Sequence, residues 1–162
     1  MYNRDSYVAK IEPFMGKPVV KVITGMRRVG KSCLVRLLID KLLAQGVARD
    51  RIVYVDKESY AFDALRTYHD LAAHVESACP ERGEMRHVFI DEIQEIEGWE
   101  RIVADWSGRR DMDVVITGSN ARLLSGELAT RLSGRFVEVP VFPLSYREFR
   151  RFHALEQADD GE

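Results

Sequence analysis

Residues Gly25 to Ser32, Gly-Met-Arg-Arg-Val-Gly-Lys-Ser, match the phosphate-loop pattern G-x-x-x-x-G-K-[ST]. A β-branched run, 17–24 (KPVVKVIT), precedes this stretch, and residues 31–45 after it carry apolar side chains at helical spacing. A phosphate loop requires this order, because the backbone N–H groups that bind phosphate lie where a strand gives way to a helix N-terminus. The stretch therefore predicts a nucleotide site within an α/β fold.

The positions of the loop have separate expected roles. Lys31 is expected to reach the β- and γ-phosphates as a point charge, and the Ser32 hydroxyl to bind Mg²⁺. Arg27 and Arg28 are open to two interpretations, added charge near the γ-phosphate or a surface that faces a partner. Cys33 is either a thiol made more acidic by the helix start or a small packed residue. The predicted nucleotide-binding residues are Gly25, Met26, Arg27, Arg28, Val29, Gly30, Lys31, Ser32 and Cys33.

A second motif is an apolar run, Val88 to Ile90, that ends in the adjacent carboxylates Asp91 and Glu92. A parallel strand delivers its carboxyl end to the ligand crevice, so this is the expected place for acidic residues that work with the phosphate loop. Asp91 is predicted to hold Mg²⁺, usually through water. Glu92 is predicted to orient and polarise the attacking water, which would make the site a hydrolase.

Short β-branched runs alternate with helical periods along the chain, which is typical of a parallel sheet covered by helices on both faces. The further strands are expected at 51–56, 87–91, 113–117 and 136–141, and the further helices at 62–79, about 99–106, 121–132 and from 145 onward. The expected fold is a three-layer α/β sandwich with a five-stranded parallel sheet. Residues 1–16 are expected to flank a core of 17–155, and 156–162 to form a frayed acidic tail.

Composition narrows the class of protein. The 162 residues carry a formal net charge of −2 and are 46% hydrophobic, so a globular domain is expected and a general polyanion-binding surface is not. Cys33 and Cys79 lack metal-ligand spacing, which favours reduced thiols and an intracellular protein. No signal core or run of about 18 apolar residues occurs, so a cytoplasmic location without membrane contact is expected.

Five stretches together resemble the AAA+-type ATPases of archaea and bacteria that have a G-x-R-R-x-G-K-[ST] phosphate loop. They are 24–32, 89–94 (Phe-Ile-Asp-Glu-Ile-Gln), 116–120 (Ile-Thr-Gly-Ser-Asn), 132–136 (Leu-Ser-Gly-Arg-Phe) and 142–149. The resemblance implies strand order 5-1-4-3-2. It also implies that Asn120 is the sensor of the γ-phosphate or the attacking water, and that Arg135, or else Arg131, is an arginine finger. Members of this family continue into a helical lid and a nuclease-like C-terminal domain, so the sequence is expected to be an N-terminal fragment.

The predicted function is Mg-dependent binding and hydrolysis of ATP, with Glu92, Lys31, Asn120 and Arg135 as catalytic residues. A GTPase is disfavoured because Asp91-Glu-Ile-Gln94 replaces Asp-x-x-Gly. One alternative is a nucleotide-binding interaction module with negligible turnover, and a less favoured one is a P-loop kinase. The expected partners are ATP or ADP and, in a longer protein, other copies of the same chain, so the fragment alone is expected to be nearly inactive. DNA has weak support from Arg109, Arg110, Arg147, Arg150 and Arg151.

Overall fold

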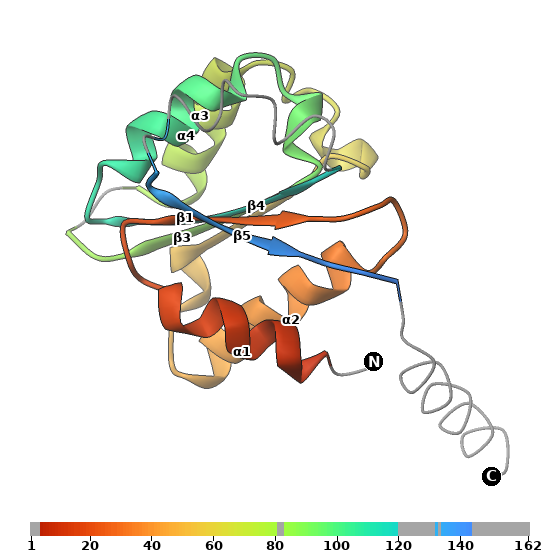
Figure 1. Cartoon of the computed structure of the whole chain (residues 1–162). Coiled ribbons are helices and arrows are strands. Elements are labelled where there is room, and N and C mark those ends of the chain that lie inside the picture. The colour runs from red at the N-terminus through yellow and green to blue at the C-terminus, as the bar shows by residue number, and fades with distance from the viewer. Residues whose placement is uncertain (1–3, 81–82, 120–131, 133, 144–162) are drawn as a thin grey trace, which may run out of the picture.

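The computed structural model describes residues 4–80, 83–119, 132 and 134–143 (Figure 1). The strands are β1 (Val20–Thr24), β2 (Ile52–Asp56), β3 (Arg86–Asp91), β4 (Met112–Gly118) and β5 (Phe136–Pro140). The α-helices are α1 (Asp5–Ile11), α2 (Lys31–Ala44), α3 (Tyr68–Ala78) and α4 (Trp99–Ser107), and 3-10 turns occur at Glu12–Phe14, Arg49–Arg51, Tyr60–Phe62 and Ile93–Glu95. Each of the five strands overlaps the stretch predicted for it, although β3 begins one residue earlier and β4 extends one residue further at each end.

The sheet is parallel throughout and has the order β2-β3-β4-β1-β5. This confirms the predicted strand order 5-1-4-3-2, which is the same order read from the opposite edge of the sheet. β4 lies between β1 and β3, the two strands that carry the phosphate loop and the acidic strand end. Since the strands are parallel, the carboxyl ends of all three meet at one edge of the sheet.

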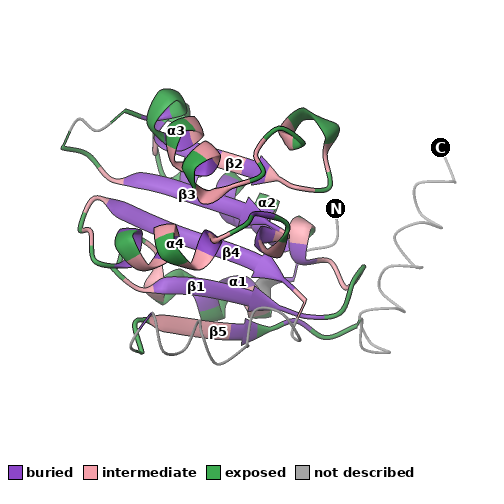
Figure 2. Ribbon diagram, turned by 90° about the horizontal axis from the view of Figure 1, so that it is seen from above, coloured by how far each residue is buried: buried purple, intermediate pink, exposed green. Residues whose placement is uncertain are grey.

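The helices form two layers, with α1 and α2 on one face of the sheet and α3 and α4 on the other (Figure 1). Every residue of β1, β3 and β4 is buried, as expected of central strands covered on both faces (Figure 2). On the α2 face the core contains Leu34, Leu38 and Leu42, which the helical spacing predicts. On the opposite face it contains Trp99 and Val103 of α4. The three-layer prediction is confirmed.

Two elements differ from the sequence prediction. The helix expected over 62–79 begins at Tyr68, because Thr67 and Asp70 form a capping box in which each side chain accepts from the other's backbone N–H. Phe62 instead ends a 3-10 turn and packs against the core from there. No helix is expected before residue 17, yet α1 buries Val8 and Ile11 against the sheet. The helices predicted over 121–132 and from 145 onward lie outside the described residues, apart from the buried Leu132.

Candidate functional site

The loop between β1 and α2 has the backbone that its glycines predict. A Cβ atom at Gly25 would lie 2.5 Å from the carbonyl oxygen of Val141 and 2.9 Å from a methyl group of Val29, so only glycine fits there. Gly30 has a φ of 93°, a left-handed conformation that glycine adopts without steric cost, and it caps α2. Glycine is therefore required at the first position by space and at the second by backbone conformation.

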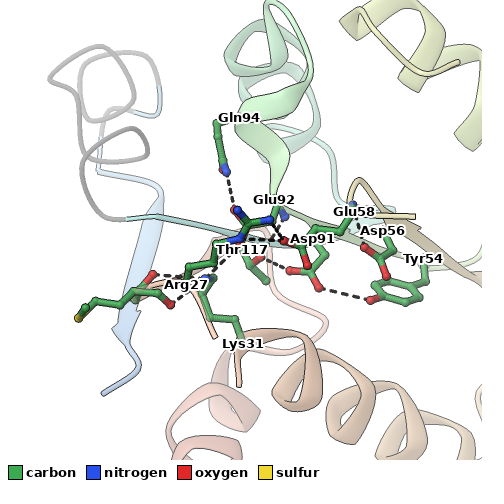
Figure 3. Close-up of polar contacts among 11 residues, drawn as sticks. Arg27, Lys31, Tyr54, Asp56, Glu58, Asp91, Glu92, Gln94 and Thr117 are labelled. Atoms are coloured by element: carbon green, nitrogen blue, oxygen red, sulfur yellow. Dashed lines mark hydrogen bonds and ion pairs between the residues drawn. The ribbon is translucent and has the colours of Figure 1, made fainter. Parts of the chain in front are cut away.

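Lys31 turns back over the loop from the first turn of α2. Its side chain is 4% exposed, and its Nζ donates to the carbonyl oxygens of Gly25 at 3.3 Å and Met26 at 3.2 Å. The same Nζ lies 3.0 Å from Oε1 of Glu92, at the end of β3 (Figure 3). The lysine of the phosphate loop and the second acidic residue thus meet, although 61 positions separate them in the sequence.

Asp91 is buried at the end of β3 and accepts hydrogen bonds from the hydroxyl groups of Thr117 of β4 and, at 3.4 Å, Tyr54 of β2. Burial raises the pKa of the Asp91 carboxyl, and interactions with the hydroxyl groups of Ser32 of α2 and Thr117 oppose the rise in part. Burial and the nearby carboxylates also raise the pKa of Tyr54. A carboxylate in contact with a serine hydroxyl is a set of hard oxygen donors, which fits Mg²⁺.

Glu92 is held from several sides. Its backbone is left-handed with a φ of 54°, an unusual conformation for a residue with a side chain, and its N–H donates to Oγ1 of Thr117 at 3.1 Å. Nε2 of Gln94 donates to the second carboxylate oxygen of Glu92. The opposite amide orientation would bring two acceptor oxygens into contact, so the nitrogen faces Glu92. Thr117 thereby connects the backbone of Glu92 to the carboxylate of Asp91, because its own hydroxyl donates to Asp91.

A cleft of about 550 Å³ opens over this edge of the sheet. Its lining residues are Arg27, Lys31, Lys57, Glu58, Glu92, Gln94, Glu95 and Ser119. A second hollow of about 520 Å³ adjoins it on the side of the loop and includes Ser32 and the exposed Cys33. Arg27 spans the two hollows and pairs with Glu58 at 2.9 Å (Figure 3). The cleft thus carries both cations and carboxylates beside the loop.

The structure does not bring Arg135 to this cleft. Arg135 precedes β5, and its carbonyl oxygen accepts from the N–H of Val20 at the start of β1. The phosphate loop follows Thr24, at the other end of β1. Five strand residues, about 17 Å, therefore separate the level of Arg135 from the loop. Asn120 and Arg131 lie outside the described residues.

Only two of the five arginines considered for DNA binding lie within the described residues. Arg109 forms an ion pair with Asp111 at 3.0 Å and Arg110 is exposed, whereas Arg147, Arg150 and Arg151 lie outside the described residues. Within the described ranges, no helix is long and apolar enough to cross a membrane. Over the same residues, no three His, Cys, Asp or Glu side chains form a metal-binding group.

Sequence analysis missed several residues of the cleft region, among them Thr117, Tyr54, Gln94 and Glu58. Thr117 offered a signal, since it ends the predicted strand 113–117 and so reaches the same sheet edge as Asp91. Gln94 falls within the stretch 89–94 that carried the family resemblance, without an assigned role. The contacts of Tyr54 and Glu58 depend on the pairing of β2 with β3, where Asp56 lies opposite Asp91. Spacing along the chain does not reveal such a pairing.

Comparison with known proteins extends this picture. A family model described as AAA domain matches residues 17–150. An uncharacterised protein of Haemophilus influenzae is 42% identical over 149 residues, which cover 92% of this chain and 37% of that protein. The uncharacterised protein MJ1544 of Methanocaldococcus jannaschii is 30% identical over 138 residues, which cover 82% of this chain and 28% of that protein. The chain thus spans about a third of the length of these relatives.

Solved structures share the fold at low sequence identity. AMPPCP-bound DnaA from Aquifex aeolicus superposes with a TM-score of 0.60 at 16% identity, over 98% of this chain and 51% of that one. PCH-2 of C. elegans superposes with a TM-score of 0.60 at 15% identity, over 96% of this chain and 47% of that one. These likenesses extend the common arrangement of strands and helices to distant proteins.

Proposed function

This chain belongs to the AAA domain family, and we propose that it binds Mg-ATP at residues 25–33 and hydrolyses it to ADP and phosphate. One observation carries the proposal. Lys31 Nζ lies 3.0 Å from Glu92 Oε1, and Asp91 with its Ser32 contact lies beside them at the same sheet edge. A phosphate-binding cation, a pair of metal-binding oxygens and a candidate base thus lie together at one edge of the sheet.

The loop and the start of α2 would bind the phosphates. Backbone N–H groups at a helix N-terminus attract anions, and the Lys31 ammonium would donate to the β- and γ-phosphate oxygens. Ser32 and Asp91 would hold Mg²⁺, which when bound supplies positive charge against the phosphate oxygens. A buried Asp91 with a raised pKa fits this role, because a cation beside it compensates the cost of the ionised carboxylate.

Glu92 would serve as the base for the attacking water. The water oxygen bonds to the γ-phosphorus, the bond from that phosphorus to the ADP oxygen breaks, and Glu92 takes the proton from the water. Glu92 is 15% exposed, and Gln94 and Thr117 fix its carboxylate and its backbone. Asn120, as sensor of the γ-phosphate or of this water, completes the proposed set within one copy. Arg135 lies far from its own loop and would act on the nucleotide of a neighbouring copy.

The alternative is a nucleotide-binding interaction module that turns over negligibly. It would share the loop, Ser32 and Asp91, but it would not need Glu92 held in the cleft by two neighbours, which is why we favour hydrolysis. A P-loop kinase would likewise have no need of Glu92. ATP or ADP, a homo-oligomer of a longer protein and a cytoplasmic location belong to the same proposal, and a role with DNA has weaker support.

The proposal is tested by nucleotide binding to the chain. A ligand at a hundred times its dissociation constant adds about 2.7 kcal/mol to the free energy of unfolding, so Mg-ADP and Mg-ATP should raise the unfolding midpoint by several degrees. Lys31→Ala should abolish this rise. Lys41→Ala is the matched control, since Lys41 lies on the same helix and pairs with Glu12 at the surface. An unmoved midpoint of the folded wild-type chain at millimolar nucleotide would contradict the proposal.

A further inference from the structure

Arg4 joins two segments that are far from it in the sequence. Its guanidinium donates through one terminal nitrogen to the carbonyl oxygen of Val29, at 2.6 Å, and through the other to that of Phe142, at 2.7 Å. Val29 belongs to the phosphate loop, and Phe142 follows the end of β5. The side chain lies in the interior, because Arg4 is only 5% exposed. The planar fork of arginine allows one residue to hold both carbonyl groups.

The helix that follows fixes the position of Arg4. Its guanidinium lies 4.5 Å from the centre of the Tyr7 ring, one turn along α1, and the Tyr7 hydroxyl accepts the N–H of Phe142 at 3.2 Å. Val8 and Ile11 of the same helix are buried in the core, and the helix itself lies beside α2 (Figure 1). Arg4 is therefore held by packing and aromatic contact independently of its hydrogen bond to the loop.

The hydrogen bond to Val29 acts on the peptide group that contributes the N–H of Gly30. A trans peptide is planar, and its C=O and N–H point in opposite directions. Arg4, by holding the carbonyl oxygen of Val29, fixes the direction in which the Gly30 N–H points. Gly30, with its φ of 93°, would otherwise have wide rotational freedom at this position. The positive charge of the Arg4 guanidinium beside this carbonyl oxygen also polarises the peptide group. This strengthens the N–H of Gly30 as a hydrogen-bond donor.

We propose that Arg4 is a positioning residue for phosphate binding. It holds the peptide between Val29 and Gly30 in one orientation before any ligand binds. Binding the phosphate chain of a nucleoside diphosphate or triphosphate then requires no further loss of conformational entropy at this peptide. The inference rests on the proposed nucleotide site. It adds that a residue outside the loop, on the N-terminal side of β1, sets the affinity of that site and ties the loop to the segment that leaves β5.

The test compares Arg4→Gln and Arg4→Lys with Lys10→Gln as control. Lys10 lies over the same Tyr7 ring at 5.5 Å but has no described contact with the loop. Calorimetric titration with Mg-ADP should give a dissociation constant about tenfold or more higher for Arg4→Gln, the scale of one lost charge-assisted hydrogen bond. The dissociation constant of Arg4→Lys should lie between those of wild type and Arg4→Gln, because an ammonium is charged but cannot hold both carbonyl groups as the guanidinium does. The dissociation constant of Lys10→Gln should match that of the wild type.

Two further measurements separate positioning from folding. The unfolding midpoint without nucleotide shows whether each variant is folded at the titration temperature, and Arg4→Lys carries the comparison if Arg4→Gln is not. Amide exchange at 25–31 should be faster in the folded Arg4 variants and unchanged in Lys10→Gln. Equal dissociation constants for wild type and folded Arg4 variants, with binding still lost in Lys31→Ala, would overturn the role of Arg4 alone. Failure of the wild type to bind Mg-ADP would overturn the nucleotide site and this inference together.

Discussion

At the scale of single residues, the candidate site depends on side chains that neighbouring strands bring together. Thr117 contacts Asp91 of β3 and Glu92 directly after it, and Lys31 reaches Glu92 from another element. The sequence motifs predicted Lys31, Ser32, Asp91 and Glu92 correctly as neighbours. They could not predict the hydrogen bonds of Thr117 or Arg4, because one hydroxyl or guanidinium has no pattern of its own and its partners lie far away in the chain.

The same residues give the first prediction. Glu92→Gln should retain nucleotide binding and lose at least about a hundredfold in ATP turnover, the usual effect of removing a general base. The amide preserves the size of the side chain and its contact with Gln94, while it cannot take a proton from water. Steady-state phosphate release by a longer protein that contains this chain measures the effect, with binding checked by titration. An unchanged rate would favour the kinase or the module without turnover.

At the scale of elements, the strands could be predicted from β-branched runs, and helices α2 and α4 from the periodic spacing of apolar residues. The start of α3 was predicted too early because Phe62 and Leu65 continue the apolar period of the helix backwards, whereas Thr67 and Asp70 set the actual start. That capping pair was present in the sequence as Thr-x-x-Asp. Helix α1 is short, and its stability comes from packing Val8 and Ile11 on the sheet, which local sequence does not reveal.

An ion-pair cluster at the amino edge of the sheet connects the starts of β3 and β4. Asp111 precedes β4 and accepts from Arg109 at 3.0 Å and from the buried Arg86 of β3 at 2.7 Å. The hydrogen bond from Arg109, with that from Arg86, lowers the pKa of Asp111 to about 2, although partial burial opposes the shift. The carboxylate therefore binds protons more weakly in the folded chain than in the unfolded one.

This difference predicts a pH dependence of stability. A lowered pKa in the folded state stabilises the protein above the unfolded pKa of about 3.8, and the contribution is lost as pH falls towards 2. Asp111→Asn should lower the free energy of unfolding at pH 7 by no more than about 2 kcal/mol. The difference in free energy of unfolding between Asp111→Asn and wild type should become smaller as the pH falls from 4 to 2, as measured by urea unfolding. Asp63 is exposed, and Asp63→Asn serves as the control, in which no such difference from wild type is expected. A difference for Asp111→Asn that stays constant between pH 4 and 2 would contradict the proposed contribution of the Asp111 carboxylate.

At the scale of the whole molecule, the parallel sheet separates two edges with different roles. The phosphate loop, Asp91 and Thr117 lie at the carboxyl edge, and Arg135 lies at the amino edge. The strand order was predictable only through the family resemblance, since alternation of strands and helices allows several orders. The same resemblance implied that Arg135 is an arginine finger. Because Arg135 lies far from its own loop, we propose that it acts at the site of a neighbouring copy.

This arrangement predicts complementation between copies. In a longer protein that contains this chain, Lys31→Ala should be nearly inactive because it loses phosphate binding. Arg135→Ala should be nearly inactive because a trans-acting arginine of this kind contributes about 10³ to 10⁵ in rate. Mixing them should restore part of the ATPase activity, since some interfaces then pair an intact loop with an intact arginine. The chain alone should bind nucleotide and hydrolyse little. No recovery in mixed oligomers that demonstrably form would leave Arg135 without a trans-acting role.

The two cysteines differ in exposure, and this has a practical consequence. Cys79 is buried in the core at the end of α3, whereas Cys33 is exposed two residues after Lys31. Thiol reagents modify accessible cysteines and leave buried ones untouched while the protein is folded. A single maleimide dye would therefore attach to the native chain at Cys33, and its fluorescence would report events at the loop without any engineered label.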